Sequence, residues 1–458
     1  MKIYDTLTGR KREFTPVADV VRMYVCGVTP YAPSHVGHAM CYIVFDMVRR
    51  YLEYRGYRVR HVQNFTDIED KLIDRAQQEK TTVTILAERH IEDYFRDMDA
   101  LNVWRAHDYP RATQEIPRIV EVITTLIDKG FAYHANSDVY FRVTREPSYG
   151  KLSHRTLDGM RAIARVDAGE HKEHPMDFAL WKAAKPGEPQ WDSPWGPGRP
   201  GWHVECTAMA LGYLGEPVDI HGGGQDLVFP HHENEIAQSE AYTGHQPFVQ
   251  FWLHNGLMHM DQEKMSKSLS NMVTVQDALE NTSADTLRMA VLGSHYRSPS
   301  GYSDDLLNAA GRGMARLRQA ALLRSGGAAD ALDSSPHRDR FVAAMDDDFN
   351  TPQALAALFD LARDINRAAE NGQAVTEAQQ TLQGLGREVL GFTFADDRPH
   401  VPAELETQVQ ELVARRTRLR TERDFAGADT VREELAQLNV TLTDTPTGTA
   451  WRWSGPSN

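Results

Sequence analysis

The sequence predicts an α/β protein: a Rossmann-type parallel-sheet domain with an insertion, then an α-helical bundle and a small C-terminal α/β domain. The apolar run at 23–28 is of strand type, apolar residues recur at helical spacing over 36–54, and 58–65 is again strand-like. This β-α-β order begins a parallel sheet, which binds ligands at the carboxyl ends of its strands. Ala- and Leu-rich stretches with helical periodicity at 305–323 and 338–390 predict the bundle.

The expected elements can be placed in order along the chain. Ser34 is a suitable N-cap for the first helix, and Gly56 follows its end. Further helices are expected at 67–80, 83–100 and 116–129, and a strand at 139–143. Two helices and a strand-turn segment are expected to complete the C-terminal end.

Breaks in composition divide the chain. Stretches rich in Gly, Ser, Asp or Pro lie at 324–337 and 394–402. We predict six segments: the first half of the sheet domain (1–109), a connective insertion (110–199), the second half of the sheet domain (200–262), a lysine-containing loop with the region after it (263–315), the helical bundle (316–400) and the C-terminal domain (401–458).

Composition excludes several classes of protein. The 458 residues carry 50 Lys and Arg against 64 Asp and Glu, a net charge of -14 that argues against a non-specific nucleic-acid binder. Neither a signal sequence nor an apolar run of bilayer length is seen, so we expect a cytoplasmic protein without membrane contact. The three cysteines, Cys26, Cys41 and Cys206, are too few for a disulfide framework and are free to act as ligands, nucleophiles or core residues.

Two short motifs point to phosphate chemistry. His35 and His38 project from the first turn of the helix at 36–54, where unpaired N–H groups favour a phosphate. Alone, such a histidine pair is more often two surface residues. The stretch K-M-S-K-S at 264–268, however, forms a cationic loop that can close over a polyphosphate. H-V-G-H followed by K-M-S-K-S resembles the paired signature of class I aminoacyl-tRNA synthetases.

The stretch F-P-H-H-E-N-E at 229–235 predicts a metal site. If a helix starts near Pro230, His231 and Glu235 share one face of it, whereas His232 and Glu233 rotate away. Cys26 and Cys206 are the candidates for two further ligands of a tetrahedral site. Because such ligands are scattered rather than paired as C-x-x-C, they favour a functional metal over a structural one.

Several longer stretches resemble cysteinyl-tRNA synthetases, and they extend from about residue 20 to the C-terminus. They are C-G-V-T-P-Y-A-P-S-H-V-G-H, N-F-T-D-I-E-D-K, G-W-H-V-E-C, H-G-G-G-Q-D-L-V-F-P-H-H-E-N-E-I-A-Q, E-K-M-S-K-S-L-S-N, A-M-D-D-D-F-N-T-P-Q-A and F-A-G-A-D-T-V-R-E-E-L. The resemblance implies one Zn²⁺ per chain, held by Cys26, Cys206, His231 and Glu235. In the family this metal binds the thiolate of the substrate L-cysteine, which a hydrophobic pocket alone would separate poorly from serine.

The resemblance also implies roles for other residues. ATP, with Mg²⁺, would be bound and activated by His35, His38, Asp226, Lys264 and Lys267. Pocket candidates are Thr29, Thr66, Trp202 and His221, of which Thr66 and Trp202 are equally well explained as core residues. The anticodon of tRNA(Cys) would be read by Arg420, Asp429 and Asp444. Charge alone favours a solvated face for the arginines around Arg420, and the resemblance gives that residue a function. A monomer is expected, and 263–315 would contact the tRNA stem.

Alternatives remain at this stage. A cysteine ligase of mycothiol synthesis shares the catalytic half but lacks the end at 401–458. A non-catalytic tRNA-binding paralogue would be expected to lose signature residues, and a zinc hydrolase would have no use for K-M-S-K-S. Two departures from the family pattern are Val36, in place of isoleucine, and Asp74, where a second lysine is common and supports activities such as persulfide formation.

Overall fold

The computed structural model describes residues 1–157, 159, 171–260, 263–264, 272–324, 329–395, 403–422, 424–445 and 448–453. The chain divides into two compact units, Met1–Phe394 and Ala395–Asn458. Each unit is described by itself.

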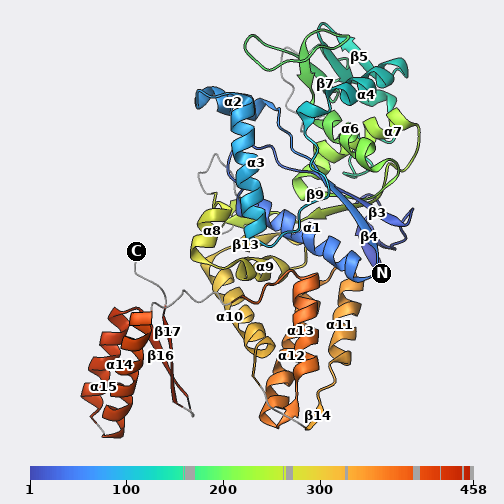
Figure 1. Ribbon diagram of the computed structural model, residues 1–458. Helices are drawn as coiled ribbons and strands as arrows, with labels where there is room; N and C mark the ends of the chain where they lie inside the picture. The colour runs from blue at the N-terminus through green and yellow to red at the C-terminus, as the bar shows by residue number, and fades with distance from the viewer. Residues whose placement is uncertain are drawn as a thin grey trace. The chain divides into compact units, whose positions relative to one another are not determined.

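A parallel sheet with strand order β10-β9-β3-β4 forms the centre of the first unit (Figure 1). Its strands are β3 (Val20–Val25), β4 (Arg58–Gln63), β9 (Val218–Gly224) and β10 (Val249–Asn255). Helix α1 (Val36–Tyr54) connects β3 to β4 on one side, while β9 and β10 extend the sheet on the other side of β3. The chain therefore reverses its strand order between β3 and β9, which is where open parallel sheets bind ligands. The predicted Rossmann-type sheet is confirmed.

Helix α1 is amphipathic only in part, because most of its residues are buried between the sheet and the helices that follow. Ile43, Met47 and Leu52 are fully buried in the largest apolar cluster of the described residues. The helix ends at Tyr54, and Gly56 follows with a φ of 86°, so the expected glycine stop is confirmed. The N-cap is His35 rather than Ser34, because the His35 ring accepts the His38 N–H that a serine hydroxyl would otherwise accept.

The remaining elements of the sheet domain flank these strands. They are the hairpin β1 (Lys2–Asp5) and β2 (Arg10–Glu13), followed by helices α2 (Asp70–Gln78), α3 (Val83–Ala100), α6 (Trp202–Leu214) and α7 (Glu233–Thr243). The two helices expected at 67–80 and 83–100 are confirmed as α2 and α3.

The segment between α3 and α6 forms a small antiparallel sheet with its own core. Its elements are η1 (Ala112–Gln114), α4 (Ile116–Asp128), β5 (Ala132–Ala135), β6 (Asp138–Phe141), η2 (Val143–Arg145), β7 (Phe178–Ala183) and β8 (Gly198–Pro200), and the strand order is β5-β6-β7-β8 (Figure 1). Trp181 and Phe141 are fully buried in that core. The antiparallel pairing contrasts with the parallel sheet that the segment interrupts.

Helices predominate in the rest of the first unit (Figure 1). The elements are β11 (Met258–Met260), β12 (Glu263–Lys264), α8 (Val275–Asn281), α9 (Ala284–Leu292), β13 (Ser300–Tyr302), α10 (Asp304–Ala321), β14 (Ala329–Ala331), α11 (Ser335–Asp346), α12 (Thr351–Glu370), β15 (Gln373–Ala374), α13 (Thr376–Gly384) and η6 (Leu385–Val389). Buried Leu317, Leu358 and Leu361 join this bundle to the large apolar cluster of the sheet domain.

The second unit contains two helices and a hairpin. Its elements are α14 (Ala403–Thr421), α15 (Phe425–Gln437), β16 (Val440–Thr445) and β17 (Gly448–Trp453), and the two strands pair antiparallel. Val409, Val431 and Leu435 form its small core. The two expected C-terminal helices and the strand-turn segment are confirmed. Among the described helices, none combines the length and the apolar character that crossing a membrane requires.

Candidate active site

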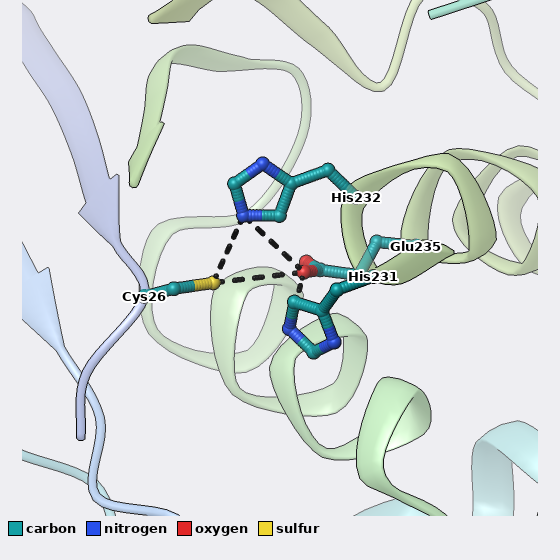
Figure 2. Close-up of side chains that lie close together, drawn as sticks. All are labelled: Cys26, His231, His232 and Glu235. Carbon is teal, nitrogen blue, oxygen red and sulfur yellow. Dashed lines mark hydrogen bonds and ion pairs between the residues drawn. The ribbon is translucent and has the colours of Figure 1, made fainter. Parts of the chain in front are cut away.

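A cluster of sulfur, imidazole and carboxylate groups lies at the carboxyl end of β3, beside β9 (Figure 2). Cys26 directly follows β3. The loop after β9 leads through a π-helical turn, η4 (Val228–His232), into α7, and these two elements supply His231, His232 and Glu235. All four side chains are buried, and their ligand atoms lie within 4.8 Å of one another, so the group could hold a metal ion.

Distances within the cluster are short. His231 Nε2 lies 2.9 Å from Glu235 Oε1, and Cys26 Sγ lies 3.6 Å from the same oxygen. His232 Nε2 is 3.3 Å from Cys26 Sγ. Cys206, on α6, places its sulfur 3.8 Å from that of Cys26. The structure therefore brings Cys26, Cys206, His231 and Glu235 together, although Cys26 and Cys206 are 180 residues apart.

The expectation that His232 rotates away from the metal face is wrong. His232 and Glu235 are three residues apart, and residues at this spacing are also neighbours on a helix surface. Glu233 does turn away: its carboxylate accepts the backbone N–H groups of Gly150 and Ser153 in the inserted segment.

Further buried histidines hold the two histidines of the cluster. His231 Nδ1 lies 2.9 Å from His203 Nδ1, and His232 Nδ1 lies 2.7 Å from His254 Nε2. His254 in turn contacts the Thr6 hydroxyl at 2.8 Å. Each ring that could bind a metal through Nε2 is therefore fixed through its other nitrogen, the arrangement usual for metal-binding histidines.

Two of the predicted pocket residues border the cluster. The indole of Trp202, whose residue is 38% exposed, stacks on the His231 ring with centroids 4.3 Å apart. His221, in β9, is buried, stacks on Trp252, and places Nε2 3.6 Å from Cys26 Sγ.

Burial shifts the protonation of the cluster. It raises the pKa of Glu235 well above the usual range of a carboxyl group and lowers the pKa of His221 and His232 well below that of a free imidazole. Burial and the hydrogen bond with Cys206 raise the pKa of Cys26, whereas the hydrogen bond from Cys26 lowers the pKa of Cys206 to about 7.

Glu235 lacks a permanent cation as its partner. Within the described ranges its ion-pair partners are histidines, with no Lys or Arg among them, and its Oε2 atom has no hydrogen-bond donor. A buried carboxylate that has no permanent cation beside it is costly, and a bound metal cation would supply the missing charge and occupy the unsatisfied oxygen.

The H-V-G-H residues, 35–38, lie at the start of α1, the helix that follows β3 and Cys26. The rings of His35 and His38 stack with centroids 3.6 Å apart, and each ring accepts the backbone N–H of the other residue. Their shared position on the first turn is thus confirmed. A Cβ atom on Gly37 would lie 2.9 Å from His35 Nδ1, so glycine leaves room for this stacked pair. Val36 N–H also donates to Val273 O at 3.0 Å, which connects the start of α1 to the chain that follows K-M-S-K-S.

The other candidate residues are placed less completely. Lys264 belongs to β12, opposite His259 of β11, whereas Lys267 lies outside the described residues. Asp226 is exposed in η3 (Gln225–Leu227), directly after β9, and Thr29 is half-buried after β3. Thr66 is buried after β4, where its N–H donates to Val28 O.

The second unit carries the three candidates for base recognition. Arg420 is exposed on α14 and Asp429 is exposed on α15, while Asp444 occupies β16 opposite Thr449. Arg415, also on α14, forms an ion pair with Glu434 of α15 at 3.5 Å. At least this arginine of α14 therefore contacts the neighbouring helix.

Comparisons with known proteins agree with this fold. Residues 13–312 match a family model described as tRNA synthetases class I (C) catalytic domain, and 340–395 match the DALR domain. A solved structure of Mycobacterium tuberculosis methionyl-tRNA synthetase in complex with methionyl-adenylate superposes with a TM-score of 0.59 over 81% of this chain and 88% of that one. Its identity of 17% supports the fold alone. The fold and the catalytic-domain match define a class I aminoacyl-tRNA synthetase.

Curated relatives identify the family within this class. A cysteine–tRNA ligase of Dehalococcoides mccartyi is 51% identical over 455 residues, covering 99% of both chains. A cysteine–tRNA ligase of Moorella thermoacetica is 51% identical over 479 aligned residues, covering 99% of this chain and all of the other. The chain belongs to the cysteine–tRNA ligase family. It is accordingly an enzyme, and the matches extend over the C-terminal unit as well as the catalytic one.

Proposed function

We propose that this chain activates L-cysteine with ATP, releasing diphosphate, and transfers the cysteinyl group to the terminal ribose of tRNA(Cys). The buried cluster at the carboxyl end of β3 is the observation that carries the proposal beyond the family. Cys26 of this cluster directly follows β3, and the chain then leads into α1, at whose start the phosphates of ATP are expected to bind.

The proposed metal is zinc. Two sulfurs bound at about 2.3 Å to tetrahedral zinc lie about 3.8 Å apart, and a sulfur and a carboxylate oxygen about 3.6 Å. The measured separations are 3.8 Å between the two cysteine sulfurs and 3.6 Å between Cys26 Sγ and Glu235 Oε1. Two thiolates with an imidazole and a carboxylate favour zinc over Mg²⁺ or Ca²⁺, which prefer oxygen.

The proposed ligands are Cys26, Cys206, His231 and Glu235, with His232 beside them. His203 would hold the His231 ring through Nδ1. When bound, the zinc would supply a soft Lewis acid that takes the sulfur of the substrate and lowers the pKa of its thiol. Serine and alanine lack such a ligand, so selection would need no editing step.

The residues of the chain would perform the rest of the first step. Trp202 and His221 would form walls of the amino-acid pocket, with Thr29 and Thr66 near it. His35, His38 and Asp226 would bind ATP, and Lys264 and Lys267 would stabilise negative charge on the reacting phosphoryl group and on diphosphate, together with Mg²⁺.

Arg420, Asp429 and Asp444 would read the anticodon in the second unit. A guanidinium group and carboxylates suit the exposed edges of unstacked bases in an RNA loop. A monomeric state, a cytoplasmic location and the six segment boundaries stay predictions from the sequence.

The test combines metal analysis with cysteine-dependent ATP–diphosphate exchange, run with serine as the competitor. We expect one zinc per chain, exchange that requires zinc, and no exchange with serine. Cys206→Ser should lose both zinc and exchange, while Cys41→Ser, the same substitution on α1 outside the cluster, should retain both. Full exchange by Cys206→Ser would contradict the zinc part, and failure to charge tRNA(Cys) despite exchange would contradict the transfer step.

A further inference from the structure

Asn64 lies between the two cysteines and belongs to none of the candidate sets above. It directly follows β4, whose last residue, Gln63, pairs with Val25, the residue before Cys26. The carboxyl ends of these parallel strands meet at one edge, so Asn64 lies beside the Cys26–Gly27 turn. It is 1% exposed.

The side-chain oxygen of Asn64 contacts both the residue that follows Cys26 and the sulfur of Cys206. Asn64 Oδ1 accepts the Gly27 N–H at 2.9 Å and lies 3.9 Å from Cys206 Sγ. Cys26 and Gly27 belong to the first half of the sheet domain and Cys206 belongs to α6 of the second, so the same amide bridges the elements that carry the two sulfurs.

The orientation of this amide is fixed by its hydrogen bonds. The Gly27 N–H requires an acceptor, which places Oδ1 on that side. The opposite end, Nδ2, donates to the Thr66 hydroxyl at 3.2 Å. Thr66 is itself held by the bond from its N–H to Val28 O at 3.2 Å. A flipped amide would direct NH₂ at the Gly27 N–H and lose that bond.

Close backbone approach at Gly27 makes the contact possible. A Cβ atom on Gly27 would lie 1.6 Å from the carbonyl oxygen of Asn64, so any side chain there would push the two loops apart. The position of Cys26, next to Gly27, thus depends on contact between the loops after β3 and β4.

We propose that Asn64 is a positioning residue for the metal site, which sets the separation of the Cys26 and Cys206 sulfurs. This inference rests on the proposed zinc function. Asn64 is not itself a ligand: it holds the Cys26–Gly27 turn through a backbone N–H and packs against the second sulfur. Residues that orient metal ligands typically change metal affinity by about 10- to 100-fold when they are removed.

The test measures metal binding without substrate. Metal-free protein is titrated with Co²⁺, which reports sulfur ligation through its absorption, and with Zn²⁺ in competition with a chelator. Asn64→Ala should weaken Zn²⁺ binding by about 10- to 100-fold and alter the sulfur-to-cobalt absorption. Thr66→Val, which removes the hydroxyl that accepts from Nδ2, should weaken it by about 2- to 10-fold.

Thr207→Val is the matched control. Thr207 neighbours Cys206 on α6 and is buried, but its hydroxyl bonds to Ser239 Oγ at 2.9 Å and Gln238 Nε2 at 2.8 Å, away from the Cys26–Gly27 turn. It should lower stability and leave the cobalt spectrum unchanged.

Equal metal affinity in Asn64→Ala and Thr207→Val would overturn the inference. If Asn64→Ala does not fold, Thr66→Val decides, and unchanged affinity in that variant would overturn it as well. Failure of the unmodified protein to bind Co²⁺ and Zn²⁺ would overturn the zinc proposal together with this one. If the unmodified protein binds both metals and Asn64→Ala binds them equally well, only the proposal for Asn64 is overturned.

Discussion

The ligand set of the metal site can be decided by two substitutions, Cys206→Ser and His232→Gln. Both side chains lie against Cys26, at 3.8 Å for the Cys206 sulfur and 3.3 Å for His232 Nε2. We expect Cys206→Ser to remove a ligand and His232→Gln to remove only a neighbour of the ligands.

The expected magnitudes follow from the geometry. A nitrogen and a sulfur on tetrahedral zinc lie about 3.5 Å apart, and a nitrogen and an oxygen about 3.4 Å. His232 Nε2 is 3.3 Å from Cys26 Sγ but 3.9 Å from Glu235 Oε1, and His231 Nε2 is 2.9 Å from that oxygen, so the two imidazoles depart about equally from the expected spacing. The separation of the two sulfurs equals the expected 3.8 Å. Cys206→Ser should therefore weaken Zn²⁺ binding by more than about 100-fold, and His232→Gln by about 10- to 100-fold.

Competition with a chromophoric chelator measures these affinities, and the absorption of the Co²⁺-substituted protein counts the sulfurs. The sulfur-to-cobalt band should weaken in Cys206→Ser and keep its intensity in His232→Gln. The reverse pattern, in which His232→Gln loses the metal and Cys206→Ser keeps it, would refute the assignment and favour Cys26, His231, His232 and Glu235.

Three other predictions concern α1, the sheet and the bundle. His35→Ala should lower ATP–diphosphate exchange by about 10²- to 10³-fold, because it removes a phosphate donor and the cap of α1; unchanged exchange would exclude His35 from ATP binding. Arg288→Met should reduce the free energy of unfolding in urea by about 3–5 kcal/mol, since fully buried Arg288 bonds to Asp46 and to the carbonyls of Leu101 and Leu390; a change below about 1 kcal/mol would contradict this. Burial lowers the pKa of His61 from 6.5 to about 3, so the unfolded chain takes up a proton that the folded chain does not as pH falls below 6.5. Stability should therefore decrease with falling pH by up to about 1.4 kcal/mol per pH unit from this group, and His61→Phe should flatten the slope between pH 6.5 and 3; an unchanged slope would contradict the assignment.

Periodicity predicted the main elements because local spacing determines them. Helix α1 was predicted at its observed bounds, and β4 within two residues of its end. The first strand was predicted at 23–28 but spans Val20–Val25, and the Gly27 N–H beyond its end bonds to the side chain of Asn64. No local pattern encodes such a contact between distant loops.

The inserted segment was harder to predict. Its helix was expected at 116–129 and is confirmed as α4 (Ile116–Asp128), but of its strands only the one at 139–143 was expected, to which β6 (Asp138–Phe141) corresponds. Its partner β7 begins at Phe178, and β8 is three residues long. Short antiparallel strands of this kind form through pairing between distant parts of the chain, which propensity does not report.

In the candidate site, too, local spacing predicted some residues and missed others. The spacing of His231 and Glu235 placed them on one face, but the same reasoning excluded His232, since it considered only residues four apart. His254 and Asn64 were missed because each reaches the cluster from another element, and a lone His or Asn in a strand or loop has no distinctive spacing. His203 lies three residues before Cys206 on α6, a helical spacing that was not considered. The K-M-S-K-S lysines had a clear motif, although Lys267 lies outside the described residues.

The proposed metal ligands come from both halves of the sheet domain, and this relates metal binding to folding. Cys26 follows β3 in the first half of the sheet domain, while Cys206, His231 and Glu235 come from α6, η4 and α7 in the second. The inserted segment separates these halves in sequence, and Glu233 joins it to the start of α7 through Gly150 and Ser153. The proposed ligands therefore meet only when β9 has paired with β3, and a metal that binds only this arrangement would stabilise it by mass action. Because the same pairing creates the edge of the sheet at which ligands are expected, the site that would recognise the substrate sulfur forms together with the fold that would hold ATP.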